Sequence, residues 1–175
     1  MRRLILLRHG KAAPQGSAPD FERSLEMRGI EESRHVGTYL LEESIVPDLV
    51  LVSSSFRTRE TWQAVSSTLG EVDHRFVPEL YLASSDQVLE SIREHALGAN
   101  TVLVIGHNPS LHDLAVELVD HGDRYAFARL REHFPTASFV VLDLPDGEWA
   151  NLRRHSMRLD RFRVPDASRD ALSDL

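Results

Sequence analysis

Short apolar runs alternate with longer amphipathic stretches along most of this 175-residue chain. The runs predict strands at about residues 4–7, 48–52, 74–77, 101–105 and 137–144. Between most of these runs, apolar residues recur every three or four positions, which is typical of helices that bury one face. Because alternating strands and helices favour a sheet covered on both faces, we expect an α/β fold with three layers, α/β/α, and a mainly parallel sheet.

Local signals mark where several helices begin. An amphipathic stretch predicts a first helix over about residues 26–43. Ser84 and Gln87 have the spacing of a capping box ahead of another amphipathic stretch. Asn108 suits the N-cap position of a later helix, and Pro109 suits its first helical position. These helices fit the α/β pattern.

The last part of the chain carries a weaker pattern. Residues 137–144 and 148–154 predict two strands joined by a turn at 145–147, and together an antiparallel hairpin at the sheet edge. The length fits one domain, which we assign to residues 1–163. Residues 164–175 are polar, and we expect this C-terminal tail to fray.

Three of the predicted strands end in residues suited to phosphate chemistry. Arg8, His9 and Gly10 follow the first strand, and His107 follows the fourth. Serines after the second strand are suited to cap a helix, which places Arg57 in its first turn. The carboxyl ends of parallel strands meet at one edge of a sheet, where such folds bind ligands, and a helix N-terminus favours an anion. The sequence therefore predicts an anion site at this edge.

These motifs, in this order, resemble those of the histidine phosphatase superfamily, which shares its fold with the cofactor-dependent phosphoglycerate mutases. The resemblance covers roughly residues 1–145 and rests on three groups: Leu7, Arg8, His9 and Gly10; Ser53, Ser54, Arg57, Thr58 and Thr61; and Gly106, His107, Asn108 and Pro109. A further group resembles a segment of the small SixA-type phosphohistidine phosphatases: Asp20, Arg23, Leu25 and Gly29. The resemblance implies a phosphoglycerate mutase-like fold and phosphatase activity.

Residue chemistry and the resemblance assign the same roles to four side chains. His9 is the candidate nucleophile, because a neutral imidazole is a competent nucleophile near pH 7. Arg8 and Arg57 are candidates for bidentate contacts with the phosphoryl oxygens, and His107 is a further donor. Arg59 is the neighbouring alternative, but only Arg57 has the family's spacing after the serines.

Gly10 and Glu79 complete the predicted phosphate- and substrate-binding set. Ester-cleaving members of the family protonate the leaving oxygen with an acid that follows the third strand, and here that segment is only residues 78–84. Glu79 is the only nearby acid, and a general-acid role and a structural or substrate-contacting role both stay open. Without enclosing insertions the site should be shallow and open, which suits a phosphoamidate such as phosphohistidine and admits a protein surface.

The leading hypothesis is a phosphatase that forms a phospho-His9 intermediate and removes phosphate from phosphohistidine on a protein. One alternative is a monoesterase that acts on small molecules or on phosphoserine and phosphothreonine. Another, from a different class, is a non-catalytic module that binds phosphorylated partners. The expected partners are therefore a phosphorylated protein or a small phosphorylated substrate, and no cofactor is expected.

The amino-acid composition argues against several other classes of function. The net charge of −7 argues against a general nucleic-acid-binding surface, because such surfaces neutralise phosphates with Lys and Arg. The chain has no cysteine, which excludes disulfides and a thiolate nucleophile. The N-terminal apolar run is interrupted by Arg8 and is too short for a signal peptide, and no stretch approaches the roughly 18 apolar residues of a membrane span. We expect a cytoplasmic protein without membrane association.

The histidines and arginines also raise the alternatives of a metal site and a basic surface. His9, His107 and His112 are conceivable zinc ligands, but neither HExxH nor Cys/His metal spacing occurs, so no metal site is predicted. Five arginines near the C-terminus are predicted to form a solvated basic face, with docking of an acidic partner as the alternative: Arg153, Arg154, Arg158, Arg161 and Arg163.

Overall fold

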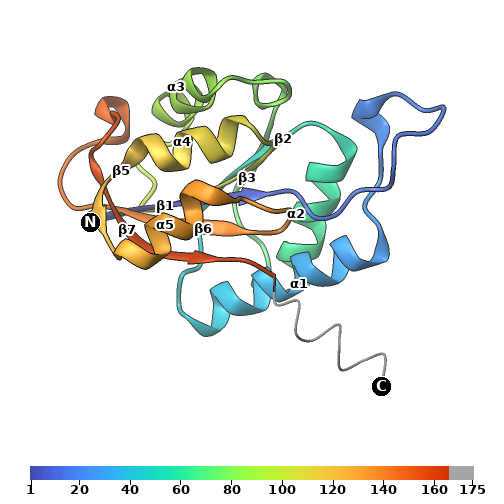
Figure 1. The fold of residues 1–175 in the computed structure, drawn as a ribbon, viewed down its shortest axis with the longest axis horizontal. Coiled ribbons are helices and arrows are strands. Elements are labelled where there is room, and N and C mark those ends of the chain that lie inside the picture. The colour runs from blue at the N-terminus through green and yellow to red at the C-terminus, as the bar shows by residue number, and fades with distance from the viewer. Residues whose placement is uncertain (166–175) are drawn as a thin grey trace.

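The computed structural model describes residues 1–165 and has a central seven-stranded sheet with helices on both faces (Figure 1). The strands follow the order β3-β2-β4-β1-β6-β7-β5 across the sheet. Their bounds are β1 (Arg2–Arg8), β2 (Leu49–Ser53), β3 (His74–Val77), β4 (Thr101–Gly106), β5 (Val119–Gly122), β6 (Phe139–Leu144) and β7 (Met157–Arg163). β6 runs antiparallel to β1 and β7, whereas the other pairings between these strands are parallel. The expected three-layer, mainly parallel α/β fold is confirmed.

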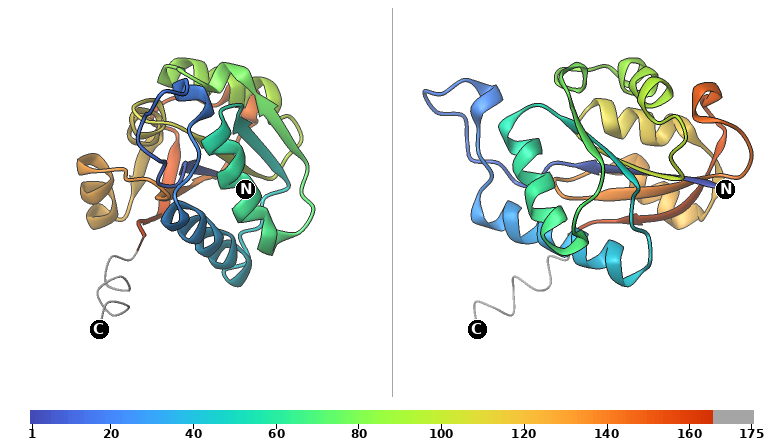
Figure 2. Two further views of the ribbon diagram at one scale, coloured as in Figure 1. Left: turned by 90° about the vertical axis from the view of Figure 1, so that its right-hand side faces the viewer. Right: turned by 180° about the vertical axis from the view of Figure 1, so that it is seen from behind.

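Helices on the two faces account for the outer layers. They are α1 (Met27–Glu42), α2 (Phe56–Leu69), α3 (Ser85–His95), α4 (Ser110–Leu118) and α5 (Arg124–Glu132), with the short 3-10 helices η1 (Asp20–Glu22), η2 (Pro78–Leu80) and η3 (Trp149–Asn151). The helices α1 and α2 pack on one face of the sheet, and α3, α4 and α5 pack on the other (Figures 1 and 2). No helix within residues 1–165 is long and apolar enough to cross a membrane.

The sheet is covered by helices on both faces, which explains why its strands have continuous apolar sequences. In β1, Leu4 and Leu6 join the core under α3 and α4, whereas Ile5 and Leu7 join the core under α1 and α2. All four side chains are fully buried. A strand with two buried faces has no polar side, so its sequence shows no alternation.

The start of α4 differs from the sequence prediction, whereas the capping box at Ser84 and Gln87 is present. α4 begins at Ser110 with Pro109 in the N-cap position, so Asn108 is not the cap. The Asn108 side-chain amide instead donates a hydrogen bond to a backbone carbonyl in the segment ahead of β6, 2.8 Å away. This tertiary bond ties the turn after β4 to a distant segment, which capping rules do not describe.

The predicted hairpin has a different second strand. Residues 149–151 form η3 because the Trp149 indole is buried and donates a 2.7 Å hydrogen bond from Nε1 to the Ala99 carbonyl. The returning strand is β7, with β5 paired parallel to its far side. Neither β5 nor α5 is predicted from the sequence. Most of the predicted tail, residues 166–175, lies outside the described residues.

Two arginines of β7, Arg158 and Arg161, form ion pairs. Asp143 of β6 is fully buried and accepts hydrogen bonds from Arg3 at 2.8 Å and from Arg158 at 2.6 Å. Arg161 bonds Asp160 at 2.6 Å. A buried carboxylate requires such partners, because an unpaired charge in the interior is costly.

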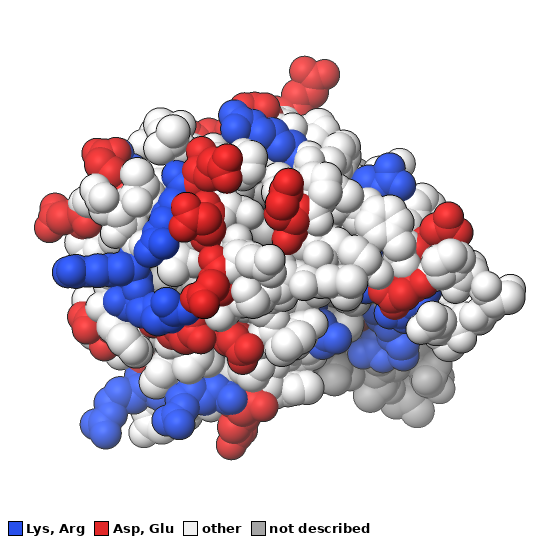
Figure 3. Space-filling model, turned by 90° about the horizontal axis from the view of Figure 1, so that it is seen from above, with Lys and Arg blue, Asp and Glu red and all other residues white. Residues whose placement is uncertain are grey.

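Ion pairs also join α3 and α4 to the segment ahead of β7. Arg154 pairs with Asp86 of α3 and with Glu117 of α4. Figure 3, a view from above in the orientation of Figure 1, shows acidic and basic side chains interspersed on that face. Arg154 is exposed, and Arg158 and Arg161 are partly exposed, but all three are paired with acidic side chains, so they do not form the uniformly basic face predicted from the sequence.

The loop between β1 and α1, residues 9–26, projects from the sheet edge where β1, β2 and β4 end (Figures 1 and 2). A backbone bridge between Ala12 and Leu25 closes the loop at its base. There α1 lies directly against the loop backbone, because a Cβ on Gly29 would lie 2.3 Å from the Lys11 carbonyl oxygen. The loop is thus held at both ends where it leaves and rejoins the body.

Gly29→Ala should lower the free energy of unfolding by about 1–3 kcal/mol, because the added methyl group collides with backbone that cannot move aside. Gly16→Ala is the matched control, since a Cβ there meets nothing within 4 Å, and it should change stability by less than about 0.5 kcal/mol. Urea denaturation of both variants and the parent measures the differences. Equal stabilities would contradict the close packing of α1 on the loop.

Candidate active site

Four side chains predicted from the sequence meet at the carboxyl edge of the sheet. Arg8 ends β1 and His9 follows it, Arg57 lies in the first turn of α2, and His107 follows β4. His9, Arg57 and His107 are buried, with 7%, 6% and 8% of their surfaces exposed. The imidazole rings are 5.3 Å apart, and Arg57 Nη2 lies 3.4 Å from His107 Nδ1.

The backbone fixes His9 from both sides. Its N–H donates to the Gly106 carbonyl of β4 at 3.1 Å, and its carbonyl accepts from the Ala137 N–H at 3.0 Å. In the side chain, Nδ1 lies 2.7 Å from the Gly10 carbonyl oxygen. Because a carbonyl can only accept, Nδ1 carries the proton and Nε2 keeps its lone pair. This is the tautomer that a nucleophilic imidazole requires.

Gly10 contributes through its backbone. Its N–H donates to Thr61 Oγ1 at 3.0 Å, and that hydroxyl donates to the Arg57 carbonyl at 2.8 Å. A Cβ on Gly10 would lie 2.6 Å from the Gly29 carbonyl oxygen, so a larger residue does not fit. Gly10 thereby joins the end of β1 to α2 and sets the distance between His9 and Arg57.

The loop that follows β1 holds Arg57. Arg57 donates from Nη1 to the Asp20 carbonyl at 2.8 Å and from Nη2 to Asp20 Oδ2 at 3.1 Å. Its buried Nε has no hydrogen-bond partner among the described residues. Arg59, the alternative in the sequence, is exposed and lies over the Phe56 ring. The predicted placement of Arg57 within α2 is therefore correct.

Arg8, like Arg57, has a hydrogen-bonded Nη donor and a buried Nε donor without a partner in the part of the chain that the structure describes. Its Nη1 donates to the Phe134 carbonyl at 3.2 Å, whereas its buried Nε has no partner within residues 1–165. Buried donors without partners are rare in folded proteins. Two of them, on two guanidinium groups at one sheet edge, indicate a ligand with several acceptor oxygens, such as a phosphoryl group.

Ser53 allows His107 to act as an acceptor or as a donor. Nε2 of His107 lies 2.8 Å from the Ser53 hydroxyl oxygen. The hydroxyl can accept a hydrogen bond from a protonated Nε2 or donate one to an unprotonated Nε2. In the first arrangement Nδ1 accepts from Arg57; in the second, Nδ1 carries a proton and becomes a donor. Nδ1 of His107 is therefore a donor only in the second arrangement.

Both imidazoles are neutral at physiological pH. Burial lowers the pKa of His9 to about 3, and the nearby His107, Arg57 and Arg8 add to this effect, while the hydrogen bond to Gly10 opposes it. Burial and then Arg57 lower the pKa of His107 to about 4. Burial and Arg57 also lower the pKa of Arg8. Neutral imidazoles beside two cations can attack an electrophile and attract an anion together.

The acid that contacts this cluster is Asp20. Its carboxylate accepts hydrogen bonds from Arg57, Arg23 and the Tyr81 hydroxyl. The Tyr81 hydrogen bond contributes most to lowering the pKa of Asp20 to about 2, so this carboxyl is ionised at neutral pH. The expectation that Glu79 is the only nearby acid is therefore wrong.

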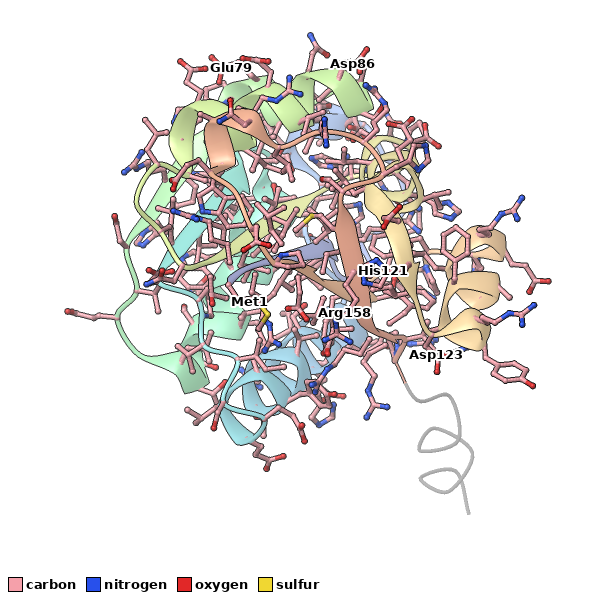
Figure 4. All side chains as sticks on the ribbon, turned by 90° about the vertical axis from the view of Figure 1, so that its left-hand side faces the viewer. Met1, Glu79, Asp86, His121, Asp123 and Arg158 are labelled. Atoms are coloured by element: carbon pink, nitrogen blue, oxygen red, sulfur yellow. The ribbon has the colours of Figure 1, made fainter. Side chains whose placement is uncertain are left out.

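Glu79 itself lies in η2 with an exposed side chain at the outer surface of the molecule (Figure 4). Within the described residues it forms no hydrogen bond or ion pair. Sequence reasoning misses both the contact made by Asp20 and the presence of Tyr81. The only sequence signal for Asp20 is the SixA-like segment that contains it, and Tyr81 lies in a turn that carries no motif.

His112 lies apart from these groups. Its Nε2 is 2.6 Å from the Leu130 carbonyl oxygen, and its ring stacks on Phe134. Within residues 1–165, no group of three or more His, Cys, Asp or Glu side chains is placed to hold a metal ion.

Comparison with known proteins defines the family, although no protein-family model matches the chain. The phosphohistidine phosphatase SixA of Escherichia coli is 34% identical over 119 residues, which cover 66% of this chain and 73% of that protein. An uncharacterised Mycobacterium tuberculosis protein is 32% identical over 161 residues, covering 91% of this chain and 99% of that protein. A solved structure from Nakamurella multipartitia, assigned as a phosphohistidine phosphatase SixA, has a TM-score of 0.84 at 30% identity, covering 95% of this chain and 97% of that one.

The chain therefore belongs to the histidine phosphatase superfamily, in its SixA-type branch. It is a phosphatase, and hence a hydrolase, which confirms the enzyme class predicted from the sequence. A solved SixA complexed with tungstate has a TM-score of 0.74 at 23% identity, covers 93% of this chain and 97% of that one, and supports the fold alone.

The imidazoles of His9 and His107 should stay neutral at about pH 5, where a free histidine with a pKa near 6.5 is mostly charged. A lowered pKa means that the neutral form persists to lower pH, so protonation should begin only as the pH approaches 4 for His107 and 3 for His9. Nitrogen NMR of the histidine rings measures this, with His9→Asn and His107→Asn assigning the signals. Titration of either ring near pH 6.5 would contradict the stated electrostatics.

Proposed function

We propose that this chain hydrolyses phosphohistidine on proteins through a phosphoenzyme intermediate on His9. One observation carries the proposal: a buried, neutral imidazole with a free Nε2 lone pair lies in one cluster with two arginines whose buried Nε–H donors are unpartnered in the described part of the chain. Phosphoryl transfer requires a positioned nucleophile and cations around the transferred oxygens. This arrangement provides both.

The reaction proceeds in two displacements. In the first, His9 Nε2 bonds to phosphorus while the bond from phosphorus to the substrate's imidazole nitrogen breaks, and its electron pair stays on that nitrogen. Arg8, Arg57 and His107 donate to the transferring oxygens. In the second, water bonds to phosphorus, the bond to His9 Nε2 breaks, and both protons of the water leave with the phosphate as dihydrogen phosphate. His9 returns to its neutral form.

The acids near the site favour a phosphoamidate substrate over an alkyl ester. An alkoxide leaving group needs a proton from a general acid. Asp20 is ionised and bonded to Arg57 and Tyr81, and Glu79 is exposed. An imidazole leaving group needs no such acid, because it departs as a neutral ring when its other nitrogen is already protonated.

The relatives support the same substrate class. The Escherichia coli relative is named a phosphohistidine phosphatase, and the Nakamurella structure is assigned to that activity. In this chain, Arg8 and Tyr81 are only partly buried, which supports access to the cluster for a phosphate group on a protein surface. The residues that carry the chemistry lie at strand and helix ends, where a rigid scaffold positions them.

A substrate comparison tests the proposal. One enzyme preparation is assayed with a phosphohistidine-bearing protein, a phosphoserine peptide and phenyl phosphate. The value of kcat/KM should be higher for the phosphohistidine protein than for either ester by about tenfold or more, because the esters depend on an acid that the site does not position.

Arg57→Ala and Arg59→Ala provide the matched control from one helical turn. Arg57→Ala should lower kcat/KM by about 10²- to 10³-fold, as removal of a preorganised donor does, and Arg59→Ala should stay within a few-fold of the parent. If an ester is the better substrate and shows this same dependence on Arg57, the enzyme is a monoesterase and the phosphohistidine proposal fails.

A further inference from the structure

Two aromatic side chains lie beside Arg8, His9, Arg57 and His107, which we call the phosphate cluster. The proposed reaction does not use these two side chains. Tyr81, which follows η2, meets the His107 ring edge-on at 5.6 Å, and the Arg57 guanidinium lies 5.9 Å from the Tyr81 ring centre. On the outer side, Phe21 of the β1–α1 loop meets Tyr81 edge-to-face at 4.9 Å. We term Tyr81 and Phe21 the aromatic wall.

The aromatic wall is tied to the phosphate-binding groups. The Tyr81 hydroxyl donates to Asp20 Oδ2 at 2.6 Å, and the same carboxylate oxygen accepts from Arg57 at 3.1 Å. A single carboxylate therefore fixes the ring and the guanidinium relative to each other. Figure 2, left, looks onto this edge, with the β1–α1 loop in blue and the segment after β3 in green.

Exposure increases along the series of ring contacts. His9 and His107 are buried, Tyr81 is half-buried, and Phe21 is 37% exposed. In an in-line displacement the leaving group departs opposite the nucleophile, so it extends from the phosphoryl group away from His9. Tyr81 and Phe21 lie on the more exposed side of the His107 ring, where such a leaving group would extend.

We propose that the aromatic wall is a leaving-group subsite that selects an aromatic ring, which, if the proposed function holds, is the imidazole of phosphohistidine. Aromatic rings attract one another in offset-stacked and edge-to-face arrangements, beyond the area that they bury. A leaving group without a ring gains nothing from this contact. The aromatic wall therefore favours leaving groups that contain an aromatic ring, whereas the arginines bind the phosphate.

Two phosphoamidates with the same type of bond isolate this effect. Phosphoimidazole carries an aromatic leaving group, whereas phosphoramidate releases ammonia. Tyr81→Leu should raise KM for phosphoimidazole about 3- to 10-fold and leave KM for phosphoramidate within twofold. Tyr81→Phe keeps the ring and removes only the hydroxyl. Because Asp20 still bonds Arg57 directly, KM for both phosphoamidates should stay near the parent. The inhibition constant of inorganic phosphate should be unchanged in both variants.

Phe76→Leu is the matched control, because Phe76 is an exposed aromatic residue of β3 that contacts His74 instead of the phosphate cluster. It should behave as the parent on both substrates. The proposal is overturned if Tyr81→Leu weakens both phosphoamidates equally. It is also overturned if Tyr81→Phe is as impaired as Tyr81→Leu, or if phosphate inhibition weakens in parallel, since Tyr81 would then act through Asp20 and Arg57.

Failure of the proposed function gives a different result. If the parent enzyme does not cleave phosphoimidazole but cleaves phenyl phosphate, the phosphohistidine assignment fails while the subsite remains testable. Tyr81→Leu should then raise KM for phenyl phosphate 3- to 10-fold without changing the inhibition constant of inorganic phosphate. An unchanged KM for phenyl phosphate would overturn the subsite as well.

Discussion

The ion pair between Arg57 and Asp20 is the contact on which the organisation of the site depends. A buried guanidinium is costly without a partner, and the partner here comes from a loop that leaves the sheet immediately after His9. Both Nη atoms of Arg57 are bound to Asp20, and the buried Nε has no hydrogen-bond partner among the described residues. The close contact between Gly29 and Lys11 at the base of the loop supports this arrangement.

Asp20 balances only part of the positive charge at this edge. The guanidinium groups of Arg8, Arg23 and Arg57 share this one carboxylate, so the site attracts an anion and disfavours protonation of its histidines. The same carboxylate holds Tyr81 through its hydroxyl. One acidic residue thus connects the Arg57 guanidinium to the aromatic wall and fixes their relative positions.

Sequence reasoning predicts the residues placed by local structure and misses those placed by distant contacts. Arg8 ends β1, and His9 and His107 follow strand ends. The serines before Arg57 set its helical register, so simple rules bring these residues together. Tyr81 meets Asp20 across 61 residues of chain, and its position depends on the path of the β1–α1 loop. The second strand of the C-terminal hairpin and the paired arginines of β7 are misassigned for the same reason, since a buried indole and a buried carboxylate decide them.

The most direct test of the central claim is to trap the phosphoenzyme. Rapid quenching during turnover of radiolabelled substrate should leave label on the protein that is stable in base and labile in acid, and peptide mapping should place it on His9. His9→Asn should carry no label, whereas His121→Asn, which changes an exposed histidine, should be labelled as the parent is. Acid-stable label, or label on His107, would contradict a nucleophilic role for His9.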